Sequence, residues 1–205
     1  MTARGRFITF EGIDGAGKST QIEVVANALR ARGLPLLITR EPGGTPLGEA
    51  LREVILHQPM SIAAETLLMF AARAEHLERV LRPALDAGTW TLCDRFTDAT
   101  YAYQSGGRGM SSERIAELEQ WVHPDLQPDL TLLFDVPPEI AAERLARARS
   151  ADRFESEQVE FFMRVRRAYL DRAGDQPSRF IVIDGTQPAD VIGARLTELM
   201  QRWNG

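Results

Sequence analysis

Five short apolar runs along the chain predict β-strands. Most of them are continuous rather than alternating, which is typical of strands that are covered on both faces in a parallel sheet. The predicted strands are Phe7–Phe10, Leu36–Thr39, Trp90–Cys93, Leu130–Asp135 and Phe180–Asp184.

Segments of helical periodicity separate these strands. Gly33 and Gly88 follow two of the segments and suit helix C-termini, and Pro138 lies near the start of another, where its missing N–H is tolerated. The predicted helices are about Lys18–Arg32, Leu47–His57, Ala64–Ala87, Ser112–Trp121, Pro138–Arg149, Ser156–Arg172 and Ala189–Trp203. Because strands and helices alternate, we expect a doubly wound α/β fold: a five-stranded parallel sheet with helices on both faces, in one domain over residues 1–205.

Composition narrows the class of protein. No stretch approaches the roughly 18 uncharged apolar residues that a membrane span needs, and the first residues do not resemble a signal peptide. With Cys93 as its one cysteine the chain forms no internal disulfide, so we expect a cytoplasmic protein with no membrane partner. The net charge of −5 argues against a nucleic-acid polymer as a partner.

A phosphate-binding loop is predicted between the first strand and the first helix. The run Gly12-Ile13-Asp14-Gly15-Ala16-Gly17-Lys18-Ser19 matches G-x-x-x-x-G-K-[ST], and its place between a strand and a helix supports the match. Backbone N–H groups and the helix N-terminus would hold the phosphates of ATP, Lys18 would reach the β- and γ-phosphates, and Ser19 would ligate Mg²⁺. Lys18 is also the one lysine in the chain. The predicted ATP-binding residues are Gly12, Gly15, Ala16, Gly17, Lys18, Ser19 and Thr20.

A second charged site is predicted where the strand Trp90–Cys93 ends. Asp94 follows this strand and would hold Mg²⁺ through water, and Arg95 would clamp the phosphate of an acceptor with two donors. Asp135, at the end of another strand, is a lower-ranked candidate for the metal. The alternative for Asp94 and Arg95 is a structural ion pair.

Three stretches together resemble the thymidylate kinase family, and the similarity covers nearly the whole chain. They are residues 10–20 around the phosphate loop, the run Thr39-Arg40-Glu41-Pro42-Gly43-Gly44-Thr45, and Asp94-Arg95-Phe96 followed by Ala102-Tyr103-Gln104 and Gly106-Gly107-Arg108-Gly109. The second run is the most specific, because a phosphate loop alone does not predict it.

The resemblance implies roles at the acceptor site. Asp14 corresponds to the carboxylate that binds the 3′-hydroxyl, and Arg95 to the arginine that holds the monophosphate. Arg40 and Pro42 correspond to the loop that walls the pocket, and Tyr103 to an aromatic ring beside the sugar that disfavours a 2′-hydroxyl. The alternative for Tyr103 is packing on a helix face.

The resemblance also implies a base pocket, with two departures from the family pattern. Arg73 corresponds to the arginine that donates to a thymine carbonyl, and Gln104 belongs to the predicted substrate-binding set. Relatives often stack a ring on the base four residues before this arginine; here Met69 stands there and Phe70 follows. We favour Phe70 over Met69 as the stacking residue, and both could instead be core. Thr100 stands where many relatives carry an amide that reads the base edge.

Arginines crowd the segment where the family carries its lid. Residues 144–156 contain four arginines, Arg144, Arg147, Arg149 and Arg153. They could fold over ATP and neutralise the charge on the transferred phosphoryl group. Ala16 occupies the place where some thymidylate kinases carry a catalytic arginine, so the chain resembles the bacterial type with lid arginines. A solvated helix face is the alternative.

The expected reaction is transfer of the γ-phosphoryl group of ATP to dTMP, giving dTDP. The predicted catalytic residues are Lys18, Arg95, Arg147, Arg149, Arg153 and Asp14. Two rivals stay open: another nucleoside monophosphate kinase, or a P-loop switch or partitioning ATPase. The resemblance further implies a homodimer, to which the predicted helix Ala64–Ala87 could contribute.

Overall fold

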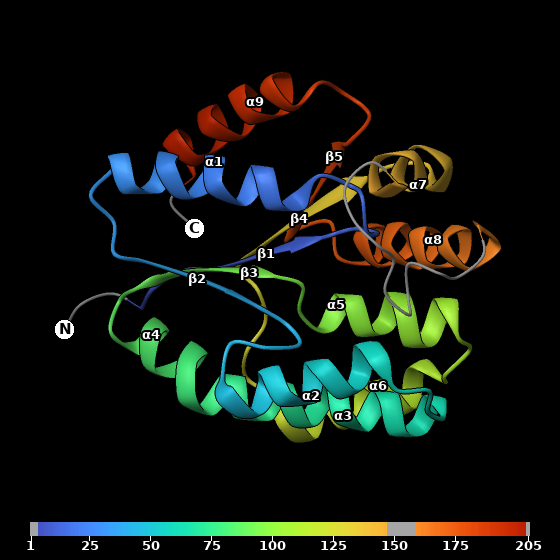
Figure 1. Cartoon of the computed structure of the whole chain (residues 1–205). Helices are drawn as coiled ribbons and strands as arrows, with labels where there is room; N and C mark the ends of the chain where they lie inside the picture. The colour runs from blue at the N-terminus through green and yellow to red at the C-terminus, as the bar shows by residue number, and fades with distance from the viewer. Residues whose placement is uncertain (1–3, 147–158, 204–205) are drawn as a thin grey trace.

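A computed structural model describes residues 4–146 and 159–203 of the chain. Five parallel strands form one sheet in the order β2-β3-β1-β4-β5 (Figure 1). They are β1 (Phe7–Glu11), β2 (Leu36–Arg40), β3 (Trp90–Asp94), β4 (Leu130–Asp135) and β5 (Phe180–Asp184). All five predicted strands are confirmed, and their parallel pairing agrees with the continuous apolar runs.

The first three strands extend one residue beyond their predicted ends, to a charged residue. Asp94 pairs with both Phe10 and Arg40 across the sheet, and Glu11 pairs with Leu133. Because the strands are parallel, their carboxyl ends share one edge, where these charged side chains gather. After β1 the chain crosses to β2 and β3, which lie on one side of β1. After β3 it crosses to β4 and β5, which lie on the other side of β1. The crevice at the end of β1 is therefore a topological switch point, where α/β proteins bind ligands.

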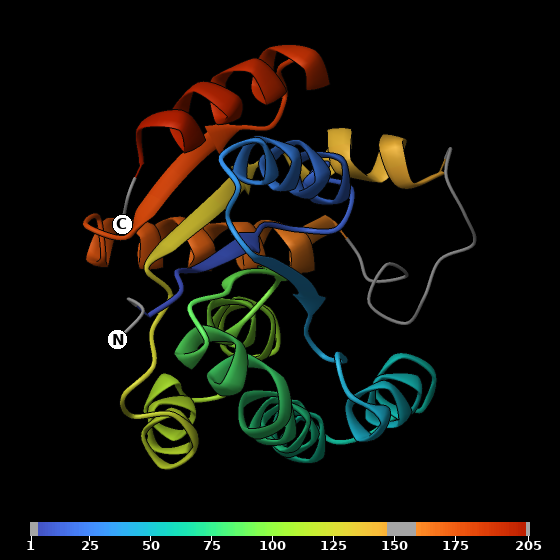
Figure 2. The same cartoon turned by 90° about the vertical axis from the view of Figure 1, so that its left-hand side faces the viewer.

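Helices cover both faces of the sheet, as predicted. On one face α1 (Lys18–Ala31) packs beside α9 (Ala189–Arg202), and on the other lie α4 (Arg82–Asp86), α5 (Thr97–Thr100) and α8 (Val159–Asp175) (Figures 1 and 2). An outer layer beyond α4 and α5 contains α2 (Pro46–His57), α3 (Ile62–His76) and α6 (Ser112–Val122), while α7 (Pro138–Ala146) follows β4. Between the layers, Phe10, Leu92 and Leu132 are fully buried and form part of the core.

The predicted helix Ala64–Ala87 is three segments rather than one. A π-helical turn, η1 (Leu77–Leu81), separates α3 from α4. Pro83 lacks the N–H that an unbroken α-helix needs at this point, which accounts for the wider turn before it. The helix also begins earlier than predicted, at Ile62, because the Ser61 side chain caps it by accepting from the backbone N–H of Ala64 at 3.3 Å.

Residues 97–107 form a helical segment that the sequence analysis does not predict. It consists of α5 and a second π-helix, η2 (Tyr101–Gly107), and it packs closely against α8. A Cβ atom at Gly106 would lie 2.4 Å from that of Ala168, and one at Gly107 would lie 2.5 Å from the ring of Phe161. These glycines weaken the helical pattern in the sequence, but they are what lets the two helices approach.

Candidate active site

The P-loop connects β1 to α1 at the sheet edge. Gly12 has a φ of 133° and lies so close to β4 that a Cβ atom there would meet the carbonyl oxygen of Phe134 at 2.5 Å. The Nζ atom of Lys18 is buried and donates to the carbonyl oxygens of Gly12 and Ile13 at 3.2 and 3.3 Å. Burial, followed by the charge of Arg95, lowers the pKa of Lys18, and an anion beside it would favour the charged form of the amine.

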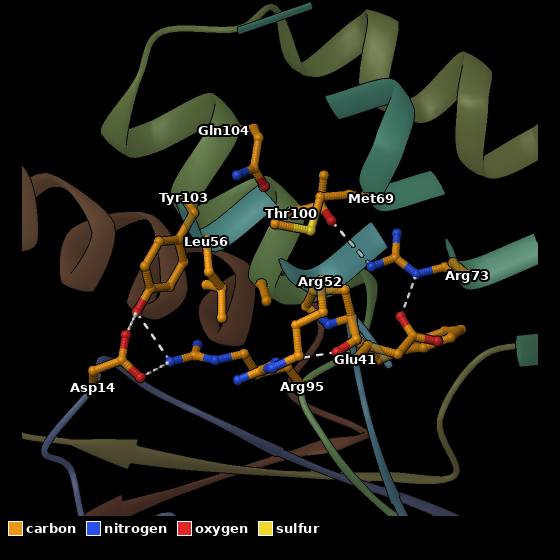
Figure 3. A pocket seen from close by; sticks show the side chains of 13 residues that line it. Asp14, Glu41, Arg52, Leu56, Met69, Arg73, Arg95, Thr100, Tyr103 and Gln104 are labelled. Atoms are coloured by element: carbon orange, nitrogen blue, oxygen red, sulfur yellow. Dashed lines mark hydrogen bonds and ion pairs between the residues drawn. The ribbon is translucent and has the colours of Figure 1, made fainter. Parts of the chain in front are cut away.

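A pocket of about 660 Å³, including its open mouth, lies beside the P-loop (Figure 3). It is lined by Asp14, Glu41, Pro42, Arg52, Leu56, Met69, Arg73, Arg95, Phe96, Ala99, Thr100, Tyr103 and Gln104. Of the predicted substrate-binding residues, all except Arg40 and Phe70 line it. The P-loop, β3, α2, α3 and the α5–η2 segment thus converge on one cavity.

Arg95 and Asp14 form a partly buried ion pair at one end of the pocket. Nη2 of Arg95 donates to Oδ1 of Asp14 at 2.8 Å and to the hydroxyl of Tyr103 at 3.0 Å, while Nη1 donates to the hydroxyl of Tyr169 at 3.0 Å. Burial alone would raise the pKa of Asp14, but the charges of Arg95 and Lys18 outweigh it and hold that pKa at about 2. Asp14 is therefore ionised at neutral pH.

The backbone of Arg95 has a φ of 71°, in the left-handed region. Residues other than glycine seldom adopt it, and such conformations persist only where the surroundings enforce them. Here the N–H of Arg95 donates to the carbonyl oxygen of Phe10 at 3.0 Å, and the thiol of Cys93 donates to its carbonyl oxygen at 3.0 Å. The turn directs the guanidinium from β3 towards the P-loop.

Arg73 lies at the opposite end of the pocket. Its Nε donates to Oε2 of Glu41 at 2.7 Å, and its Nη2 donates to Oγ1 of Thr100 at 3.1 Å (Figure 3). Its Nη1 is buried and has no hydrogen-bond partner among the described residues. A buried donor of this kind at a pocket wall indicates a place for an acceptor on a bound ligand.

Two expectations about this pocket are corrected. Phe70 does not line it: the ring is 2% exposed and stacks on His123 at 6.5 Å, in the layer between α3 and α6, whereas Met69 faces the cavity. Arg40 is also outside it, in an ion pair with Glu49 at 2.7 Å. Successive helix positions face directions about 100° apart, so an aromatic ring one place along cannot replace the residue at the pocket wall.

The predicted metal ligands share a neighbouring groove. Ser19 and Asp94 both line it, and Oδ1 of Asp94 is buried without a hydrogen-bond partner among the described residues. Asp135 is already engaged, because both of its oxygens accept from Arg166, at 2.6 and 2.9 Å. The described residues contain no group of three or more His, Cys, Asp or Glu side chains placed to hold a metal. Mg²⁺ in phosphate sites commonly uses only one or two carboxylates besides phosphate and water, so the hydroxyl of Ser19 and the unpaired oxygen of Asp94 fit it.

The predicted lid arginines Arg147, Arg149 and Arg153 lie outside the described residues. The helix that precedes them, α7, contacts the P-loop directly, since a Cβ atom at Gly15 would lie 2.4 Å from the carbonyl oxygen of Ala141. Arg144 is engaged elsewhere, because its Nη1 donates to the carbonyl oxygen of Gly185 at 2.9 Å.

The structure adds pocket residues that the sequence analysis missed. Arg52, on α2, donates to the carbonyl oxygen of Pro42 at 3.1 Å and adds a positive charge to the pocket besides those of Arg73 and Arg95. Glu41 belongs to the run from Thr39 to Thr45, but that sequence motif does not indicate which side chains Glu41 contacts. Tyr169 does not line the pocket but accepts from Arg95, and it lies 74 residues away in the sequence, where no local pattern signals the contact.

Comparisons with known proteins find chains that are similar in sequence and in fold. The sequence model of a family described as thymidylate kinase matches residues 10–195. The thymidylate kinase of Methylobacillus flagellatus is 58% identical over 200 residues, which cover 98% of each chain. That of Cupriavidus metallidurans is 60% identical over 197 residues, or 96% of this chain and 98% of the relative. A crystal structure of thymidylate kinase from Ehrlichia chaffeensis superposes with a TM-score of 0.78 at 33% identity, over 97% of this chain and 99% of that one. Among the described residues, no helix has the length and apolar character needed to cross a bilayer.

Proposed function

This chain belongs to the thymidylate kinase family, and on that premise we propose how its own residues carry out the reaction. The protein catalyses ATP-dependent phosphorylation of dTMP. The observation that carries the residue roles is the ion pair between Asp14 and Arg95, which makes the P-loop one wall of the acceptor pocket. The nucleotide phosphates and the acceptor phosphate would then meet beside one loop, as direct transfer requires.

ATP phosphates are held by the P-loop. The backbone N–H groups from Gly15 to Ser19 and the positive end of α1 face the anion, and Lys18 exchanges its carbonyl acceptors, Gly12 and Ile13, for phosphate oxygens. Ser19 and Asp94 would hold Mg²⁺ in the groove that they share. When bound, the metal would supply positive charge that offsets the negative charge developing during transfer.

The acceptor phosphate is clamped by Arg95, with Arg52 as a second cation. Both guanidiniums line the pocket, and arginine matches phosphate geometry through paired donors. Asp14 binds the 3′-hydroxyl of the sugar, and the Tyr103 ring leaves little room for a 2′-hydroxyl. Positioning and charge neutralisation are the main contributions of the protein, since the attacking phosphate oxygen is already an anion.

The base is read at the end of the pocket that contains Arg73. The unpartnered Nη1 of Arg73 supports donation to a base carbonyl, while Met69 packs on the ring and Thr100 and Gln104 complete the wall. The lid function of residues 144–156 remains a prediction, with Arg147, Arg149 and Arg153 as its cations. The contact of α7 with the P-loop supports it, because the lid would then begin beside the nucleotide.

A homodimer would cover the outer helical layer. Leu47 and Val54 on α2, Leu67 on α3 and Trp121 on α6 are between 41% and 78% exposed, and these helices lie in the layer farthest from the sheet (Figure 1). Light scattering should report twice the monomer mass for the native chain and a monomer for Leu67→Glu combined with Trp121→Glu. A cytoplasmic location is supported by the single cysteine, Cys93, which is a buried thiol.

The assignment is tested by ADP release from Mg·ATP with a panel of acceptors. The panel contains the monophosphates of thymidine, deoxyuridine, deoxycytidine, deoxyguanosine and adenosine, free thymidine, and no acceptor. Turnover that strongly favours dTMP is the expected result. Preference for another monophosphate would keep the kinase mechanism and overturn the base assignment, and equal ADP release without any acceptor would indicate a switch ATPase.

A further inference from the structure

The guanidinium of Arg73 is held by a buried carboxylate rather than left free to search the pocket. Its Nε donates to Oε2 of Glu41 at 2.7 Å, while its Nη2 donates to Thr100, and its Cζ atom lies 5.1 Å from the centre of the Phe96 ring. Arg73 and Glu41 are 2% and 4% exposed, so water does not compete for these bonds. Two donors pointing at two fixed acceptors set both the position and the rotation of the guanidinium.

Glu41 is fixed in turn by a buried histidine. Nδ1 of His76 lies 2.9 Å from Oε1 of Glu41, and Nε2 lies 2.7 Å from Oγ1 of Thr39. Burial alone would raise the pKa of Glu41, but the charge of Arg73 and the hydrogen bond from His76 lower it below its ordinary value. Glu41 is therefore an ionised acceptor, and Nδ1 of His76 carries the proton that it donates to Glu41.

The loop between β2 and α2 is built around this pair. Gly44 has a φ of 77°, and a Cβ atom there would lie 2.6 Å from Nε2 of His76 and 2.7 Å from Oγ1 of Thr39. A side chain at this position would push the loop away from α3. The run from Thr39 to Thr45 thus does more than wall the pocket, because it supplies both the carboxylate and the space that hold Arg73.

We propose that Glu41 and His76 are positioning residues that set the base selectivity of the pocket by fixing the donor face of Arg73. This inference rests on the proposed function, in which Arg73 meets the pyrimidine base. It adds that the acceptor on the base is the carbonyl at ring position 4. Guanidinium groups donate hydrogen bonds and cannot accept them. Thymine and uracil present an accepting carbonyl at that position, whereas cytosine presents an amino group, which is itself a donor.

Selectivity of this kind requires that the donor cannot turn away. A mobile guanidinium could withdraw from the amino group of cytosine and leave both groups hydrated, so cytosine would be penalised little. A guanidinium held by Glu41 must keep its donor against the amino group, and two buried donors facing each other are strongly unfavourable. Arg73 supplies the chemistry of recognition, and Glu41 and His76 supply its rigidity.

The test is the substitution Glu41→Gln, assayed as kcat/KM with dTMP, dUMP and dCMP. The amide has nearly the same shape but removes the charge that holds Arg73. The ratio of kcat/KM for dTMP to that for dCMP should fall about tenfold, the size expected for losing a charge-assisted hydrogen bond. The ratio for dTMP to dUMP should stay unchanged, because these bases share the 4-carbonyl and differ by a methyl group. General damage to the fold would lower all three values together.

A matched pair at position 76 tests the same idea if Glu41→Gln folds poorly. His76→Asn places its amide nitrogen near the former Nδ1 and keeps a donor for Glu41, whereas His76→Gln places its amide near the former Nε2 and keeps only the contact with Thr39. Both remove the ring, so both create a similar cavity. The dTMP to dCMP ratio should stay near the native value in His76→Asn and fall in His76→Gln.

The native enzyme tests the base assignment separately from the positioning role of Glu41 and His76. If it does not prefer dTMP to dCMP, the proposed base assignment fails before any variant is compared. If it does prefer dTMP, but Glu41→Gln and His76→Gln leave the dTMP to dCMP ratio unchanged, the assignment stands and the positioning role of Glu41 and His76 is overturned.

Discussion

Nη2 of Arg95 lies 2.8 Å from Oδ1 of Asp14, so the turn after β3 is tied directly to the P-loop. The hydroxyl of Tyr103 joins both partners, at 3.0 Å from the guanidinium and 3.2 Å from Oδ2 of Asp14. The P-loop, the turn after β3 and η2 therefore share one hydrogen-bonded group where the P-loop meets the pocket. A displacement of any one of them would alter the distance between donor and acceptor phosphates.

Replacement of Asp14 by Asn should weaken acceptor binding more than folding. The ionised carboxylate accepts from Arg95 and is the proposed partner of the sugar 3′-hydroxyl, so kcat/KM for dTMP should fall about 10- to 100-fold. An acceptor that lacks the 3′-hydroxyl separates these two roles. If Asp14 binds the hydroxyl, Asp14→Asn should affect the 3′-deoxy acceptor much less than dTMP. An equal loss with both acceptors would show that Asp14 acts only through Arg95.

Replacement of Asp94 by Asn should raise the Mg²⁺ concentration needed for half-maximal turnover, by about tenfold. The variant keeps an oxygen at the site but removes the charge, so excess Mg²⁺ should restore most of the lost activity. Asp135→Asn is the matched control, because both oxygens of Asp135 are occupied by Arg166. A larger shift in Asp135→Asn than in Asp94→Asn would exchange the two assignments.

Sequence patterns predicted the parts of this site that lie on one continuous segment. The P-loop spacing located Lys18 and Ser19, and the end of a buried strand located Asp94 and Arg95. In both cases the alternation of strands and helices already indicates which sheet edge the residues occupy. The predicted and observed strands agree for the same reason, since continuous apolar runs report burial on both faces.

These sequence patterns did not predict contacts between distant segments of the chain. The π-helix after α5 was missed because its glycines are explained only by the approach of α8. Phe70 was preferred to Met69 on chemistry alone, whereas the choice depends on which face of α3 points to the cavity. The contact of Glu41 with His76 spans 35 residues, and no local rule pairs a loop carboxylate with a histidine on a later helix.

Substitutions of Met69 and Phe70 should have different effects. Met69→Ala removes a pocket wall and should raise KM for dTMP about three- to tenfold, with little change in stability. Phe70→Leu should lower the free energy of unfolding by about 1–2 kcal/mol while changing KM much less, because the ring packs in the core beside His123. Urea denaturation and initial rates measure the two effects separately. The reverse pattern would restore Phe70 as the residue that stacks on the base.

The stability of the protein should depend on pH through Glu11. This carboxyl group is fully buried at the end of β1, where it accepts from the backbone N–H of Phe96 at 2.7 Å and from the hydroxyl of Tyr169 at 2.8 Å. Burial, and then the negative charge of Asp98, raise the pKa of Glu11 from 4.5 to about 8. In the window between these values the folded protein binds a proton that the unfolded chain has released.

The two pKa values determine whether the contribution of Glu11 to the free energy of unfolding rises or falls with pH. The contribution of Glu11 is fully present below pH 4.5 and is lost as the pH rises to about 8, because the buried group must then ionise. In Glu11→Gln the amide cannot ionise, so the variant should gain stability relative to the native chain as the pH rises from 5.5 to 8.5. Each unit of pKa shift corresponds to about 1.4 kcal/mol, so a gain of at least this size is expected from urea denaturation at the two pH values.

His123 has the opposite dependence, since burial, and then the charge of Arg73, lower its pKa. It is present in both proteins, so its contribution cancels in the difference between variant and native chain. A difference between variant and native chain that stays constant across this range would mean that Glu11 is already ionised in its buried site.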